Sequence, residues 1–187
     1  MLHCVTSISS KSRKKSVTRT IRLEEDQEEA LIHEAEKRGF SVNALIGHIF
    51  DRYITGYRFF DTSNMLVMGS STINEFLGRL EINEISEIGD IAGQARIRSS
   101  LMQRGRKLNF ENLAWYISQV LGENYGWYRC DYREEGNQAT FHLTHQMGYK
   151  WSVFLESYIT SAFNEILNRN CNTVTMINAV NIEVSMG

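Results

Sequence analysis

The 187-residue chain contains no proline, although proline makes up about 5% of an average protein. Its turns must therefore depend on other turn-forming residues, and the 13 glycines suit that requirement. No apolar run approaches the ~18 residues of a membrane-spanning helix. The first 15 residues lack the apolar region of a secretory signal. We therefore expect a cytoplasmic protein with no membrane partner.

Cysteine is scarce, and the common enzyme motifs are missing. Cys4, Cys130 and Cys171 are odd in number and widely spaced, which argues against a disulfide framework. The sequence has no nucleophile elbow, P-loop, HExxH zinc helix or dinucleotide fingerprint. We therefore expect no enzymatic activity and no cofactor.

Positive charge gathers near the N-terminus, although the whole chain has a formal net charge of −2. Residues 11–22 contain no acid, and their basic residues are Lys11, Arg13, Lys14, Lys15, Arg19 and Arg22. Such a segment attracts nucleic-acid phosphates, but it can also be a solubilising, disordered arm. A second basic cluster, between Arg96 and Lys107, is typical of a solvated helix face.

The segment Val17–Leu23, VTRTIRL, alternates between apolar and polar residues. This alternation predicts a β-strand whose apolar face carries Val17, Ile21 and Leu23. The polar face then carries Thr18, Thr20 and Arg22. A lone strand leaves its backbone donors and acceptors without partners, so this one must pair with another strand.

Two helices are predicted after this strand. The first begins in the acidic residues at 24–29, carries Leu31 and Ala35 on a narrow apolar stripe, and stops at Gly39. Ser41 is the expected N-cap of the second helix, which ends near Gly56. Its apolar face carries Ala44, Leu45, Ile49, Tyr53 and Ile54.

A strand, an acidic helix, a Gly-aromatic-Ser turn and a second helix, in this order, resemble the ribbon-helix-helix family of DNA-binding proteins, the Arc, MetJ and CopG type. The resemblance covers residues 15 to about 56. It implies that the strand pairs antiparallel with the same strand of a second subunit, so that folding requires a homodimer. It also implies that the polar face of this two-stranded ribbon enters the major groove of double-stranded DNA.

The resemblance assigns contacts to individual residues. Base contacts fall to Thr18, Thr20 and Arg22, and Arg22 suits a bidentate contact with guanine. Phosphate contacts fall to the start of the second helix, at Ser41, Val42 and Asn43, and to the arm residues Lys11, Arg13, Lys14 and Lys15. Two features depart from the family pattern. Gln27 and Glu28 stand where it usually has a buried aliphatic residue, and Arg19 falls on the inward face of the strand.

The rest of the chain predicts a different domain. We expect a flexible basic arm at 1–14, a ribbon-helix-helix domain at 15–57 and an α+β domain at 58–187. The last domain is expected to contain a strand at 65–68, helices from a Thr72–Glu75 capping box to 102 and at 109–121, a hairpin at 127–143, a helix at 151–167 and a strand at 174–184. This order is compatible with a ferredoxin-like βαββαβ sheet with an enlarged first crossover.

Residues near the start of the long helix are candidates for an effector site. Gly148 permits a sharp turn there, and Tyr149, Lys150 and Trp151 could meet an anionic or aromatic small molecule. The alternative is simple hydrophobic packing at the helix entry. Potential metal ligands are His142, His145, Cys130 and Cys171. The two histidines lie three apart, on opposite faces of a regular strand, and no metal is expected.

The function that these patterns favour is sequence-specific DNA binding by a transcriptional regulator. Its C-terminal domain would sense a ligand or set the oligomeric state, as in many ribbon-helix-helix regulators. Two alternatives remain open at this point. The first domain could be a dimer clamp while the second binds a partner protein, or the chain could be a metal-responsive regulator.

Overall fold

The computed structural model describes residues 17–60 and 65–187. The arm residues Lys11, Arg13, Lys14 and Lys15 lie outside the described residues. The chain divides into two compact units, one ending at Gly47 and the other running from His48 to Gly187. The division falls inside helix α2 (Val42–Thr55), before the boundary expected at residue 57.

The first unit contains helix α1 (Glu25–Arg38) and the beginning of α2. The Gln27 side chain accepts a hydrogen bond of 3.1 Å from the backbone amide just before α1. Gly39 ends α1 in the left-handed conformation, with φ of 68°. The Ser41 hydroxyl caps α2 by accepting a hydrogen bond of 3.2 Å from a first-turn amide. Both predicted helices, the stop at Gly39 and the cap at Ser41 are therefore confirmed.

Residues 17–24, which contain the predicted ribbon strand, are neither helix nor strand in the single chain. The pairing partner expected for this segment is the same segment of a second subunit. The single chain therefore leaves that pairing a prediction.

The second unit contains most of the helices. They are η1 (Tyr57–Phe59), α3 (Ser70–Gly78), α4 (Ile82–Gln103), α5 (Phe110–Trp115), the π-helix η2 (Tyr116–Asn124) and α6 (Gly148–Leu167). Asn109 caps α5, with its side-chain oxygen 3.0 Å from a first-turn amide. The expected cap at Thr72 is wrong, because α3 begins at Ser70 and has no side-chain cap. The helix expected at 109–121 is divided into α5 and η2, and η2 continues to Asn124.

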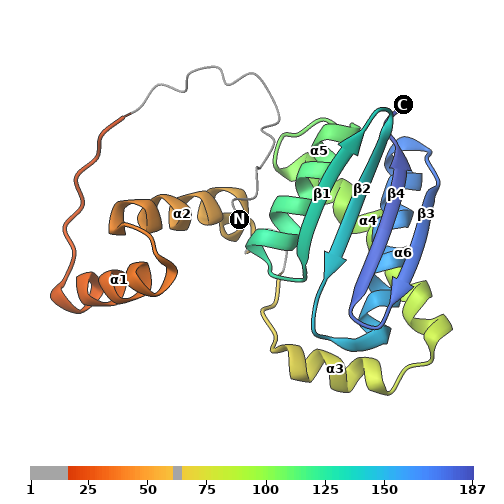
Figure 1. Ribbon diagram of the computed structural model, residues 1–187, viewed down its shortest axis with the longest axis horizontal. Helices are drawn as coiled ribbons and strands as arrows, with labels where there is room; N and C mark the ends of the chain where they lie inside the picture. Colours follow the sequence, from red (N-terminus) through yellow and green to blue (C-terminus); the bar gives the residue numbers. More distant parts are fainter. Residues whose placement is uncertain (1–16, 61–64) are drawn as a thin grey trace. The chain divides into compact units, whose positions relative to one another are not determined.

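Four antiparallel strands form one sheet in the second unit. They are β1 (Arg129–Glu135), β2 (Gln138–Thr144), β3 (Cys171–Met176) and β4 (Ala179–Ser185), in the spatial order β1-β2-β4-β3. The sheet therefore consists of two hairpins joined through α6 (Figure 1). The predicted hairpin and long helix are confirmed, as is the α+β class.

The expected βαββαβ arrangement differs from this sheet at both ends. Residues 65–68 form no strand, and Leu66 and Val67 are 75% and 78% exposed. Apolar character alone does not make a strand without a neighbour to hydrogen-bond. Residues 174–184 form two strands instead of one, because the chain turns at Asn178, whose carbonyl accepts a hydrogen bond from the His145 amide.

One face of the sheet forms the core, and the helices α4 and α6 lie on this side (Figure 1). Alternate strand residues point into it, among them Phe141 and Ile182, which are opposite each other in register. Helix α4 approaches α6 closely at two glycines. A Cβ atom on Gly89 would lie 2.8 Å from the Phe154 carbonyl oxygen, and one on Gly93 would lie 2.0 Å from the carbonyl oxygen at position 158.

Within the part of the chain that the structure describes, no helix has the length and apolar character needed to cross a membrane.

Candidate functional site

The predicted base-contacting residues Thr18, Thr20 and Arg22 are exposed. Among the residues that the structure describes, Arg22 takes part in no salt bridge. Arg19, which was expected on the inward face of the strand, is exposed as well. These side chains are therefore accessible to a ligand outside the chain.

The predicted phosphate-binding residues lie at the beginning of α2. Ser41 and Asn43 are exposed, and Val42 is half-buried. The Ser41 hydroxyl is engaged in capping. Apart from the Ala44 amide, which donates to the Ser41 hydroxyl, first-turn backbone amides lack partners within their own helix and can bind an anion.

The apolar residues of this region are largely uncovered in the single chain. Among residues 17–47, the buried side chains are those of Ala35 and Leu45. Val17 and Ile21 are 66% and 51% exposed. Other large apolar side chains exposed here and on α2 are Ile32, Phe40, Ile49, Phe50, Tyr53 and Ile54. Exposed apolar side chains in this number are typical of a surface that contacts another molecule.

Two of the three residues expected to bind an effector are hydrogen-bonded to backbone carbonyl oxygens of the same chain. The Lys150 ammonium group donates hydrogen bonds of 3.0, 3.1 and 2.6 Å to three carbonyl oxygens at the end of α3. The Trp151 indole nitrogen donates to the Trp127 carbonyl oxygen at 3.2 Å, and Tyr149 is exposed. Lys150 therefore holds the C-terminal end of α3, and Trp151 holds the segment before β1.

The potential metal ligands are also separated. Cys130 and His142 belong to paired strands, but Cys130 lies on the core side and His142 on the outer side. Burial raises the pKa values of Cys130 and Cys171 to about 12. Among the described residues, no three His, Cys, Asp or Glu side chains gather into a metal-binding group.

Both ring nitrogens of His145 are engaged in the fold. Its Nδ1 accepts a hydrogen bond of 3.1 Å from the Met147 amide, so the proton of the neutral ring lies on Nε2. Nε2 then donates to the Ser152 hydroxyl at 3.0 Å. Burial lowers the pKa of His145. The residue therefore fastens the β2–α6 connection as a neutral imidazole.

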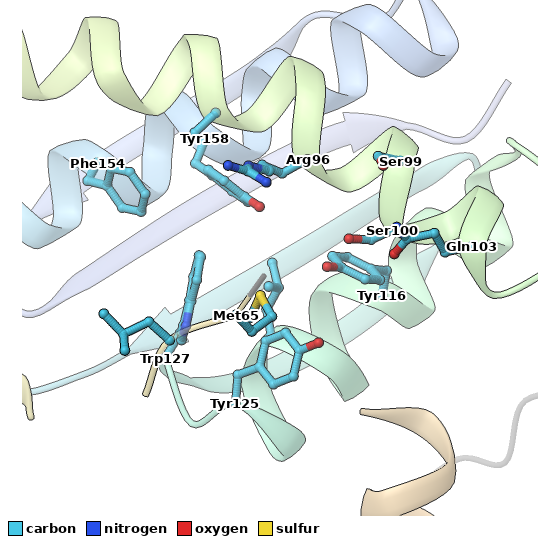
Figure 2. Close-up of a pocket in the computed structure, with 13 residues that line it drawn as sticks. Met65, Arg96, Ser99, Ser100, Gln103, Tyr116, Tyr125, Trp127, Phe154 and Tyr158 are labelled. Atoms are coloured by element: carbon cyan, nitrogen blue, oxygen red, sulfur yellow. The ribbon is translucent and has the colours of Figure 1, made fainter. Parts of the chain in front are cut away.

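The second unit contains a cavity of about 450 Å³ that was not predicted from the sequence. We call it the aromatic pocket. It lies between α4, η2 and α6, with Met65 and Leu66 also lining it. Figure 2 shows its aromatic residues, which are Tyr116, Tyr125, Trp127, Phe154 and Tyr158. Nearby rings contact one another: the Trp127 centroid lies 5.3 Å from that of Tyr158 and 6.0 Å from that of Phe154.

Polar groups line another part of the aromatic pocket: Arg96, Ser99, Ser100 and Gln103 of α4. Figure 2 shows the Tyr116 and Ser100 hydroxyl groups near each other at this side. Burial raises the pKa of Tyr116 to about 12, while a hydrogen bond with Ser100 acts in the opposite direction. Its phenol therefore stays protonated. The lining includes Arg96 but no acidic side chain.

Arg104 connects the wall of the aromatic pocket to the end of α2. Its guanidinium group donates to the Thr55 carbonyl oxygen at 3.2 Å, the Ser100 carbonyl oxygen at 3.0 Å and the Tyr125 hydroxyl at 3.0 Å. It also lies over the Phe59 ring, 4.1 Å from the centroid. One side chain thus joins α2, η1, α4 and the loop after η2.

Asn124 makes a second link between η2 and α2. Its side-chain amide donates to the Thr55 hydroxyl at 2.7 Å, and its backbone carbonyl oxygen accepts a hydrogen bond of 2.9 Å from the Arg52 guanidinium group. Arg52 also donates to the Tyr57 hydroxyl at 2.7 Å. The last turn of α2 is therefore bonded to the elements that form the pocket.

The sequence patterns predicted which helices contain many of these residues, but they did not predict that the residues line a common pocket. Tyr116 and Tyr158 fit the apolar stripes of their helices, and Arg96 fits a solvated face. The local sequence gives no signal that the three side chains meet, because they come from separate helices.

Comparison with known proteins gave no match to this chain: no family model, no curated protein and no solved structure.

Proposed function

We propose that the protein is a sequence-specific, cytoplasmic DNA-binding regulator of the ribbon-helix-helix type that acts as a homodimer. The single observation that supports this proposal is that exposed apolar side chains and exposed polar side chains alternate in the predicted ribbon segment, residues 17–23. Val17 and Ile21 are exposed, and they alternate with Thr18, Thr20 and Arg22. A partner strand would cover the backbone and the apolar side chains, and would leave the polar side chains for DNA.

Dimerisation follows from the energetics of burial. Fully burying one large apolar side chain contributes roughly 1.5–3 kcal/mol. Phe50, Tyr53 and Ile54 of α2 are about half exposed in the single chain. Covering these side chains and the residues of the ribbon in both subunits would offset the entropy lost on association. Folding of the N-terminal region is thus coupled to dimer formation.

DNA binding would depend on two kinds of contact. Arg22 and the threonines of the ribbon would read base edges, and the start of α2 would bind a phosphate. The arm residues Lys11, Arg13, Lys14 and Lys15 would add attraction that is independent of sequence. No catalytic step is part of this proposal.

Gel-shift titration with duplex DNA, combined with sedimentation velocity, tests the proposal. The full chain should bind as a dimer at ~50 mM salt and lose affinity roughly 10³–10⁵-fold by 200 mM if 6–10 phosphates are contacted. Absence of a complex at ~50 mM salt would refute DNA binding.

A pair of matched variants links dimerisation to DNA binding. Phe50→Glu places a charge on the exposed apolar face of α2 and should abolish both the dimer and the complex. Ile91→Glu places the same charge on an exposed apolar position of α4 and should abolish neither. A dimeric Phe50→Glu protein would contradict the interface.

A protein-interaction module is the second candidate, because α4 also exposes apolar side chains. Ile88, Ile91 and Met102 are exposed on this helix. A partner protein could cover them. A dimer that ignores DNA and co-purifies with another protein through the face containing Ile91 would favour this candidate.

A further inference from the structure

We propose that the aromatic pocket binds a flat aromatic carboxylate, and that this ligand acts on α2 through Arg104. The regulatory half rests on the proposed function, because α2 belongs to the predicted DNA-binding region. The binding half depends on the second unit alone.

The size and walls of the aromatic pocket specify an aromatic ligand. A volume of about 450 Å³ lies within the usual range for small-molecule sites. Phe154 and Trp127 are half-buried at the wall, and Tyr158, which also lines the pocket, is buried. Rings prefer offset or edge-to-face contacts at centroid distances of roughly 4.5–7 Å, so a flat ligand can extend the group that these rings already form (Figure 2).

The polar side of the pocket specifies a negative charge. Arg96 is exposed at its rim, and no described carboxylate lies within salt-bridge distance of it. Guanidinium groups bind carboxylates through two parallel hydrogen bonds. The hydroxyl group of Ser99 supplies a further donor on the same helix, while that of Ser100 is bonded to Tyr116. With no acid in the lining, nothing there repels an anion.

Arg104 carries the effect of the ligand to α2. Tyr125 and Ser100 line the pocket, and both accept hydrogen bonds from Arg104. The same guanidinium group bonds the Thr55 carbonyl oxygen at the last residue of α2. A ligand that moves or immobilises Tyr125 therefore changes the hydrogen bonding of the end of α2, and so changes DNA affinity.

Calorimetric titration of the full chain tests the binding half. The probes are benzoate, 2-naphthoate and biphenyl-4-carboxylate, with 2-naphthamide as the uncharged control. At least one acid should bind below millimolar concentration, and 2-naphthoate should bind more tightly than 2-naphthamide. Arg96→Gln should weaken binding of the acids roughly 10–100-fold, because a hydrogen bond to a charged group is worth about 1.5–3 kcal/mol, and should leave amide binding unchanged.

The matched control is Arg98→Gln. Arg98 lies two positions away on α4, is also exposed, and pairs with Glu165 at 3.2 Å outside the pocket lining. Its variant should bind the acids as the unmodified chain does. The binding half is wrong if no acid binds, if the amide binds as tightly as 2-naphthoate, or if the Arg98 variant is weakened as much as the Arg96 variant.

Hydrogen exchange with the tightest acid tests the regulatory half. The amides of the last turn of α2 and of η1 should exchange more slowly when the acid is bound. In Arg104→Gln the acid should still bind but this protection should be lost. Binding without any change at α2 would overturn the regulatory half. A chain that binds the acids and protects α2 but never binds DNA would refute the proposed function and not the pocket.

Discussion

Replacing Gly93 by alanine should destabilise the second unit by separating α4 from α6. The new Cβ atom would lie 2.0 Å from the Tyr158 carbonyl oxygen and 2.3 Å from the Ser161 hydroxyl. An ordinary contact needs at least 3.4 Å, so the helices must move apart by about 1.4 Å at this point. That movement would also stretch the hydrogen bond of 2.8 Å between the hydroxyls of Ser86 and Ser157.

The expected magnitude combines two opposing effects. Overpacking costs about 1–3 kcal/mol, while alanine is better than glycine in a helix by about 1 kcal/mol. Since a carbonyl oxygen of the backbone cannot rotate away as a side chain can, we expect the upper part of the overpacking range. The free energy of unfolding should then fall by roughly 2 kcal/mol. With a urea m-value of about 2 kcal/mol per molar, the unfolding midpoint should fall by roughly 1 M.

Tryptophan fluorescence during urea unfolding measures this effect. Trp115, Trp127 and Trp151 all belong to the second unit, so the signal reports on that unit. Gly89→Ala, with a closest approach of 2.8 Å, should lower the midpoint less. Gly78→Ala is the control, because its Cβ would meet nothing within 4 Å. A Gly93→Ala protein as stable as the unmodified chain would refute the close packing of α4 and α6.

Further predictions concern single side chains. Lys150→Met should speed amide hydrogen exchange in α3 without comparable change in α6, because it removes three hydrogen bonds to carbonyl oxygens at the end of α3; equal rates in α3 would show that Lys150 does not hold it. Because burial lowers the pKa of His145, the unfolded chain takes up a proton more readily at this position. Its contribution to stability should be complete above pH ~6.5 and be lost as the pH falls toward the lowered pKa. His145→Gln should therefore reduce the slope of the free energy of unfolding against pH in this range. An unchanged slope in the variant would show that His145 is not the cause. With pKa values of about 12, the thiols of Cys130 and Cys171 should react with iodoacetamide far more slowly in the native protein than in urea, as followed by peptide mapping; rapid native alkylation would refute their burial.

The sequence predicted the helices and turns that are determined by residues close to one another in the chain. The apolar spacing of α6, the cap at Ser41 and the stop at Gly39 depend on neighbours a few residues away. The hairpin turn was also readable, because Gly136 takes the left-handed conformation, with φ of 61°, that glycine favours.

Features that depend on contacts between residues far apart in the sequence could not be predicted in this way. The apolar run at 65–68 resembled a strand, but no neighbouring strand satisfies its backbone. Lys150 resembled a ligand-binding cation, and only the fold brings the end of α3 to it. The aromatic pocket requires helix α4, the π-helix η2 and helix α6 to converge. The widened η2 has no simple periodic signature, and π-helices are frequent at functional sites.

Selection of duplex DNA from a random pool tests the central proposal most directly. The unmodified chain should enrich one sequence with two related half-sites, as a twofold-symmetric dimer requires. In the same selection Arg22→Ala should lose preference at one base and bind the enriched site about 1–3 kcal/mol more weakly. Arg79→Ala, which changes an exposed arginine at the end of α3, should select the same sequence as the unmodified chain. A pool that remains random after selection with the unmodified chain would contradict sequence-specific DNA binding.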